Sequence, residues 1–138
     1  MSNGETSLTE ARVKHLEFIQ AAIGRISGHS FGIKGLSVTV AAAVSSFAAS
    51  EQRAAIMIWG AMPILVLWGL DAWYLRCERM FRAMYDAARG ETGETNFKMQ
   101  PQEYQDRVDS WFFTLWATTV SWVYAPLFLL LILGAIVL

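Results

Sequence analysis

Two charged side chains lie at the outer ends of the two uncharged stretches in the first half of the chain. Their positions would allow them to form an ion pair. Lys34 precedes the uncharged residues 35–50, and Asp71 follows the uncharged residues 54–70. A tight turn between the two stretches would bring Lys34 and Asp71 to almost the same depth. A charge inside a membrane is costly and is usually tolerated through pairing, which predicts an intramembrane charge pair near the cytoplasmic boundary. The alternative is that both side chains extend separately into the lipid headgroups.

Four arginines in the stretch from Asp71 to Gly90 form the candidate ligand-binding set: Arg76, Arg79, Arg82 and Arg89. Their simplest role is to set topology and attract anionic lipid, since each basic side chain near a membrane surface contributes about 1 kcal/mol of attraction. The sharper hypothesis is a vestibule formed by several copies around an axis. Such a ring multiplies each arginine by the subunit number and gathers phosphate groups. The sequence leaves both interpretations open.

Hydroxyl side chains recur at helical spacing in the last uncharged run. Thr114, Thr118 and Ser121 are therefore the candidate pore-lining residues. On one continuous helix they would share a face with Ala125 and could line a water-filled pore. Hydroxyls in apolar helices more often bond to the backbone or to neighbouring helices, so packing is the alternative interpretation.

No residue pattern typical of catalysis or metal binding occurs in the chain. His15 and Glu17 are two residues apart, which is not a metal-ligand spacing on a helix, and His29 is isolated. Cys77 is the only cysteine, which excludes an internal disulfide and a cysteine-based zinc site. There is no glycine-rich phosphate loop, nucleophile elbow or HExxH pattern. We therefore expect neither enzyme activity nor a cofactor.

The composition indicates a membrane protein. Apolar residues make up 54% of the 138 residues and charged residues only 17%, whereas a soluble domain averages about 25% charged residues. The uncharged runs cover residues 35–50, 54–70 and 110–138. A crossing helix needs about 20 residues, so the first two runs are slightly short and the third is long. The first turns of the third run should lie in the interface, where Trp111 and Trp116 suit an aromatic belt.

The elements that carry these residues predict an all-α membrane protein with four parts. Residues 1–30 should form an amphipathic helix that lies on the membrane surface or packs against other cytoplasmic parts. Residues 31–75 should form a transmembrane helical hairpin. Its second helix continues into a cytoplasmic helix and loop, residues 76–109. Residues 110–138 should form a third, C-terminal transmembrane helix.

Local patterns refine this division. Glycines at positions 28, 32 and 35 should loosen the chain before the first span. Small residues recur every four positions in that span, a pattern by which helices pack closely in lipid, at Ser37, Ala41, Ser45 and Ala49. Residues 91–105 are polar and predict a loop, and Gln102 to Asp109 should begin the next helix.

The distribution of basic residues predicts the topology. Basic side chains gather at the outer ends of the first two spans, at Arg25, Lys34, Arg76, Arg79 and Arg82. Arg53 alone lies in the turn between those spans. By the positive-inside rule, the N-terminus and residues 72–109 are cytoplasmic and the C-terminus is outside. Three short spans bury little surface alone, so we expect a homo-oligomer surrounded by membrane lipid.

Three segments resemble a family of small bacterial multi-span membrane proteins: residues 13–20 (VKHLEFIQ), 30–39 (SFGIKGLSVT) and 67–86 (LWGLDAWYLRCERMFRAMYD). The resemblance covers residues 13–90 and is weaker in the last span. Proteins of this type resemble the membrane effectors of anti-phage defence systems, such as the channel subunit of the Hailong system. The resemblance implies the bacterial inner (plasma) membrane, a nucleotide or oligonucleotide ligand and a partner nucleotidyltransferase. No site residue is transferred from that family.

Two functions follow as hypotheses. The first is a homo-oligomeric membrane effector, an ion channel or pore that is gated by a cytoplasmic nucleotide or oligonucleotide signal. The second is a non-conducting membrane anchor or scaffold that recruits a soluble partner through the helices of residues 8–26 and 72–89. The hydroxyl side chains of the third span distinguish the two hypotheses. If they face an axis shared by several copies, they favour a channel. If they pack against neighbouring helices, they favour a scaffold.

Overall fold

The structure, a computed structural model, describes the backbone of residues 2–90 and 97–138 and the side chains of residues 9–90 and 97–138. Its elements follow in the order α1 (Ser2–Glu51), α2 (Ala54–Gly90), the 3-10 helix η1 (Pro101–Arg107), α3 (Trp111–Leu115) and α4 (Thr118–Val137). These described residues contain no β-strand. The all-α class predicted from the sequence is therefore confirmed.

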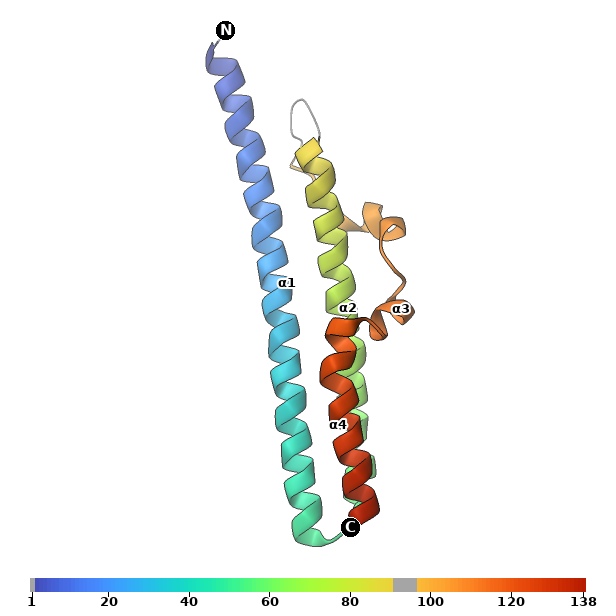
Figure 1. Ribbon diagram of the computed structural model, residues 1–138. Coiled ribbons are helices and arrows are strands. Elements are labelled where there is room, and N and C mark those ends of the chain that lie inside the picture. The colour runs from blue at the N-terminus through green and yellow to red at the C-terminus, as the bar shows by residue number, and fades with distance from the viewer. Residues whose placement is uncertain (1, 91–96) are drawn as a thin grey trace.

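The two long helices α1 and α2 run antiparallel, side by side, and a short turn joins them at the lower end of the molecule (Figure 1). Gln52 ends α1 in the left-handed region, with a φ of 54°. This conformation commonly terminates a helix, because it turns the chain away from the helix axis. The Arg53 backbone N–H then donates to the Ala48 carbonyl oxygen at 3.2 Å, which closes the turn.

Helix α1 continues without a break past the glycines at positions 28, 32 and 35. The prediction that these glycines loosen the chain before the first span is therefore wrong. Each glycine costs a helix about 1 kcal/mol relative to alanine, but side chains before, within and after this stretch are buried: Ile19, Ala22, Ser30 and Ser37. Packing against α2 outweighs the weak local propensity. The N-terminal amphipathic helix thus follows the second predicted alternative, packing against another element.

Helix α4 lies beside the lower part of α1 and α2 (Figure 1). The three helices enclose one core, which consists of Ala41, Ala48, Met57, Ile64, Val120, Tyr124 and Leu131. Of the predicted small-residue series, Ser37 and Ala41 are buried, whereas Ala49 is exposed and Ala48 takes the inner position. A Cβ on Gly60 would overlap Val44. Small residues therefore allow these helices to approach closely.

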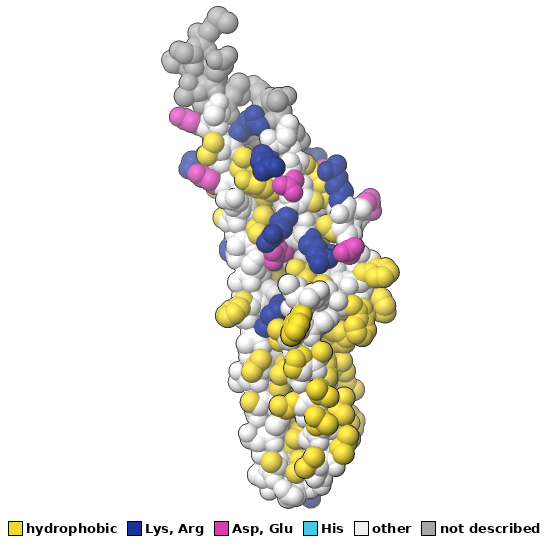
Figure 2. Space-filling view, viewed as in Figure 1, with side chains coloured by type: hydrophobic (Ala, Val, Ile, Leu, Met, Phe, Trp, Pro, Cys, Tyr) yellow, Lys and Arg dark blue, Asp and Glu magenta, His cyan; other side chains and the backbone are white. Residues whose placement is uncertain are grey.

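Polarity divides the surface along the length of the molecule (Figure 2). We call the lower part, residues 35–70 with α4, the apolar half, and the upper part, residues 9–34 and 71–90 with η1, the charged half. The apolar half exposes large side chains such as Trp59, 72% exposed, and Trp122, 76% exposed. Large exposed apolar surfaces mark contacts with lipid or with other proteins.

The third uncharged run is divided between two helices. Helix α3 ends at Leu115, Ala117 is non-helical with ψ at 140°, and α4 begins at Thr118. Two indole N–H groups hold α3 against α2: Trp111 donates to the Gly69 carbonyl oxygen at 3.0 Å, and Trp68 donates to that of Leu115 at 3.1 Å. Because these bonds fix α3 across α2, one straight helix cannot run through residues 110–138.

The segment before α3 also differs from the prediction. Gln102 to Asp109 does not begin the next long helix. Instead η1 covers Pro101–Arg107, and Val108 is extended with φ at −126° and ψ at 152°. The predicted loop of residues 91–105 lies partly outside the described residues, which resume at Phe97.

Candidate functional site

The structure brings Lys34 of α1 and Asp71 of α2 together at the boundary between the two halves. The Lys34 ammonium nitrogen lies 2.7 Å from both carboxylate oxygens of Asp71. Asp71 is fully buried, and the Lys34 side chain is 22% exposed. Ser30, one turn before Lys34, donates a hydrogen bond to Asp71 and accepts one from Lys34 at 2.8 Å. Since a buried charge is tolerated only when it is paired, these three side chains depend on one another.

A second polar contact extends this cluster to α4. The Tyr124 hydroxyl lies 3.2 Å from Ser37 Oγ and donates to the Leu67 carbonyl oxygen at 3.3 Å. Tyr124 is only 1% exposed. One hydroxyl thereby connects all three long helices immediately below the charge pair. We call Ser30, Lys34, Ser37, Asp71 and Tyr124 the polar junction.

Sequence reasoning missed three members of the polar junction. Ser30 and Ser37 lie four residues before and three residues after Lys34, on the same helical face. That spacing, together with a lone tyrosine in the apolar residues 118–137, was the sequence feature that could have indicated further members of the polar junction. Nothing in the sequence alone placed Tyr124 at the same depth, because the break between α3 and α4 sets the register of α4.

The four candidate arginines do not form a free cationic surface within one chain. Asp109 receives two of them: Arg76 Nε donates to its backbone oxygen at 3.2 Å, and Arg79 pairs with its carboxylate at 2.8 Å. Arg82 pairs with Glu78 at 2.6 Å. Arg89 lies in the last turn of α2. A phosphate ligand would therefore have to compete with Asp109 and Glu78.

A groove between α1 and α2 contains one of these arginines. It has a volume of about 480 Å³ and is lined by Gln20, Ile23, Gly24, Arg82, Tyr85 and Asp86. Gly24 leaves open space, since a Cβ there would meet nothing within 4 Å. The groove offers a guanidinium and an aromatic ring side by side, an arrangement that suits phosphate and base together.

The three candidate pore residues do not share one helical stripe. Thr114 belongs to α3, is fully buried, and donates to the Ser110 carbonyl oxygen at 3.0 Å. Thr118 is exposed and Ser121 is half-buried, both on α4. The predicted common face is wrong because it assumed one continuous helix. Thr114 follows the packing alternative, whereas Thr118 and Ser121 remain open to a neighbour.

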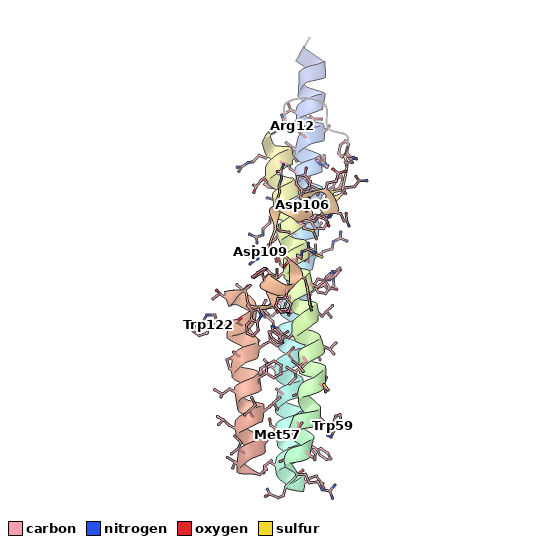
Figure 3. The ribbon with its side chains drawn as sticks, turned by 90° about the vertical axis from the view of Figure 1, so that its right-hand side faces the viewer. Arg12, Met57, Trp59, Asp106, Asp109 and Trp122 are labelled. Atoms are coloured by element: carbon pink, nitrogen blue, oxygen red, sulfur yellow. The ribbon has the colours of Figure 1, made fainter. Side chains whose placement is uncertain are left out.

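Aromatic side chains lie at both ends of the apolar half. Trp122 lies near the start of α4, and Trp59 lies near the opposite end, close to Met57 (Figure 3). Phe112, Phe113 and Trp116 are 65%, 73% and 66% exposed around α3, beside the boundary. Aromatic residues prefer the two interfaces of a membrane, so their positions bracket an apolar layer.

The fold and its surface are compatible with a multi-pass membrane protein. Three helices are long and apolar enough to cross a membrane: α1, α2 and α4. With 20 residues, α4 is about 30 Å long, which equals the thickness of a bilayer core. Among the described residues, no group of three His, Cys, Asp or Glu side chains could hold a metal ion.

Comparisons of the chain with protein-family models, with curated proteins and with solved structures found no match.

Proposed function

We propose that the protein is a homo-oligomeric membrane effector, an ion channel or pore gated by a nucleotide or oligonucleotide in anti-phage defence. One observation carries the proposal. Helices α1 and α2 each run unbroken from the apolar half into the charged half. A ligand that binds the charged half of one oligomeric state better than another would shift the equilibrium between states, and the continuous helices would transmit that shift to the apolar half.

Assembly of several copies is supported by the outer face of α1. Gly28 and Gly32 are spaced four residues apart and exposed, and a Cβ on either of them would meet nothing within 4 Å. Packing within one chain therefore does not require these glycines, although each weakens the helix. Glycines at this spacing allow a second helix to approach closely. A neighbouring copy of α1 gives them a role.

In this proposal the ligand binds the charged half through Arg79, Arg82 and the groove beside Tyr85. The N-terminus and the charged half are cytoplasmic in a bacterial inner membrane, and a nucleotidyltransferase supplies the signal. Lys34 and Asp71 lie where the two halves meet. Because this ion pair joins α1 to α2, any movement of one helix against the other would have to change its geometry.

Conductance of the purified protein in planar bilayers tests the proposal, before and after addition of short oligonucleotides and cyclic nucleotides. We expect discrete current steps that one of these ligands switches on or off. In Arg79→Glu/Arg82→Glu the oligomer should still form, but the effective ligand concentration should rise more than about tenfold, since a hydrogen bond to a charged group contributes about 1.5–3 kcal/mol. Lys14→Glu/Arg25→Glu is the matched control with the same charge change.

A silent bilayer with correctly inserted oligomer would overturn the channel proposal. An unchanged ligand response in the double arginine variant would remove the ligand site from α2.

The buried Thr114 favours a second candidate function, a non-conducting membrane anchor or scaffold. Its hydroxyl donates to the carbonyl oxygen of Ser110, the N-cap residue of α3, instead of facing an aqueous axis. The exposed face of the charged half would then recruit a soluble partner. Cysteine accessibility separates the two candidates: Thr118→Cys and Ser121→Cys should react with a water-soluble thiol reagent in a channel, and should resist it in a scaffold.

A further inference from the structure

A second pocket lies in the charged half, where η1 folds back against α2 (Figure 3). Its volume is about 170 Å³. The polar part of its lining consists of His15, Lys98, Gln100, Glu103 and Tyr104, and the apolar part of Met84 and Ala88. A concave site with a few converging polar groups beside apolar ones is the usual form of a small-molecule site. This pocket shares no lining residue with the groove at Arg82.

One polar atom of this pocket is buried without a partner. His15 is 7% exposed, and its Nδ1 has no hydrogen-bond partner in the described part of the chain. The ring is held edge-on against Phe97, with centroids 5.6 Å apart. Buried polar atoms in folded proteins are nearly always satisfied, so an unsatisfied one calls for a bound water or ligand. The unprotonated nitrogen of a neutral imidazole accepts a hydrogen bond.

The two charges of the pocket cancel each other. Lys98 and Glu103 form an ion pair at 3.0 Å, and each side chain is about half exposed. A purely anionic ligand would be repelled by Glu103, and a purely cationic one by Lys98. A small zwitterion satisfies both charges. Replacing the ion pair with ligand contacts costs little, because exposed ion pairs are weak.

We propose that this pocket binds a free α-amino acid with a small apolar side chain. The ligand ammonium donates to the Glu103 carboxylate and to the imidazole of His15. The ligand carboxylate accepts from Lys98 and from the amide of Gln100. The side chain lies against Met84 and Ala88. Bound in this way, the amino acid links η1 to α1 and α2. This role is separate from the proposed gating by a nucleotide.

Isothermal titration of the full chain in lipid nanodiscs tests the site with three matched probes. L-Alanine carries both charges, propionate lacks the ammonium group, and ethylamine lacks the carboxylate. We expect L-alanine to bind at least about tenfold more tightly than either analogue, because each analogue leaves one charged contact unmade. Conductance is not needed for this readout, so failure of the channel proposal leaves it interpretable.

Two variants locate the binding. Glu103→Gln and His15→Leu should each weaken L-alanine binding about tenfold or more, because each removes one acceptor of the ammonium group. Glu17→Gln and His29→Gln are the controls, since neither residue lines the pocket. Glu103 is half exposed, so its variant folds even where His15→Leu disturbs the packing.

Three results would overturn the proposal. The first is equal binding of propionate and L-alanine, which would indicate an anion site. The second is no heat of binding for L-alanine up to millimolar concentration, which would leave water as the only occupant. The third is full binding in Glu103→Gln.

Discussion

The apolar half and the charged half of the same helix pair are held together in different ways. In the apolar half, α4 joins α1 and α2, and the three helices enclose an apolar core with the polar junction at its upper end. In the charged half, which α4 does not reach, α1 and α2 bury Ile19, Met80 and Met84 and also form side-chain hydrogen bonds with each other. Examples are Ser27 to Glu78 at 2.9 Å and Gln20 to Tyr85 at 3.4 Å.

The glycines show what this difference means. In the apolar half, Gly60 lies against Val44 and Gly134 against Met57, so one chain already uses the space that each glycine provides. Gly28 in the charged half faces open space. The apolar half is therefore tightly packed within one chain around Gly60 and Gly134. The outer face of α1 in the charged half has room for a helix from elsewhere.

The largest expected effect lies at the polar junction. Asp71→Leu leaves the Lys34 ammonium group partly buried without its carboxylate, and Lys34→Met leaves the fully buried Asp71 with Ser30 alone. Each single change should lower the free energy of unfolding by about 3–5 kcal/mol, the usual cost of removing one partner of a buried ion pair. The double variant should recover most of this loss, since no unpaired charge remains. Helicity measured by circular dichroism during denaturant titration in micelles provides the readout.

An exposed ion pair within α1 in the charged half is the control for this experiment. Lys14 and Glu17 lie 3.1 Å apart, and both side chains are more than half exposed. Lys14→Met should change the free energy of unfolding by about 0.5 kcal/mol or less. If Asp71→Leu were no more harmful than Lys14→Met, the polar junction would not hold the helices together.

The two kinds of glycine provide the second prediction. Gly60→Ala should destabilise the protein by about 1–3 kcal/mol, because its Cβ forces Val44 out of a packed core. Gly28→Ala should stabilise the isolated chain by up to about 1 kcal/mol, since alanine favours a helix and meets no neighbour. Denaturant titration measures both changes.

The same glycines test the oligomer. If a second copy approaches at Gly28, the bulky Gly28→Leu should reduce the oligomeric fraction measured by light scattering in detergent, while helicity is retained. An unchanged oligomeric fraction would place the interface elsewhere.

Much of the fold could be predicted from the sequence, because apolar run length and charge position are local properties. Between Gly69 and Gly90 the sequence contains no proline or glycine, and α2 indeed runs unbroken to Gly90. The helix break after Leu115 could not be predicted. It depends on the Trp68 and Trp111 indoles, which bond across elements more than 40 residues apart in sequence.

The candidate site likewise contains residues whose positions could be predicted from the sequence and residues whose positions could not. Lys34 and Asp71 were predictable, since a tight hairpin fixes the depth of its two ends. Tyr124 was not predictable, because its depth depends on where α4 starts. The pairing of Arg79 with Asp109 was hidden for a similar reason: 30 residues and one 3-10 helix separate the two.

A matched pair of tyrosines gives the smallest expected effect and the most direct comparison of the two halves. Tyr124→Phe removes a buried hydroxyl that serves Ser37 and Leu67, which should lower the free energy of unfolding by about 1 kcal/mol. Tyr85→Phe removes a hydroxyl whose partner is the exposed Gln20, at 3.4 Å. Water replaces that contact, so its loss should stay within about 0.5 kcal/mol. Denaturant titration of both variants measures the difference. Equal losses would mean that the hydroxyl of Tyr124 is no more important to the apolar half than a surface contact is to the charged half.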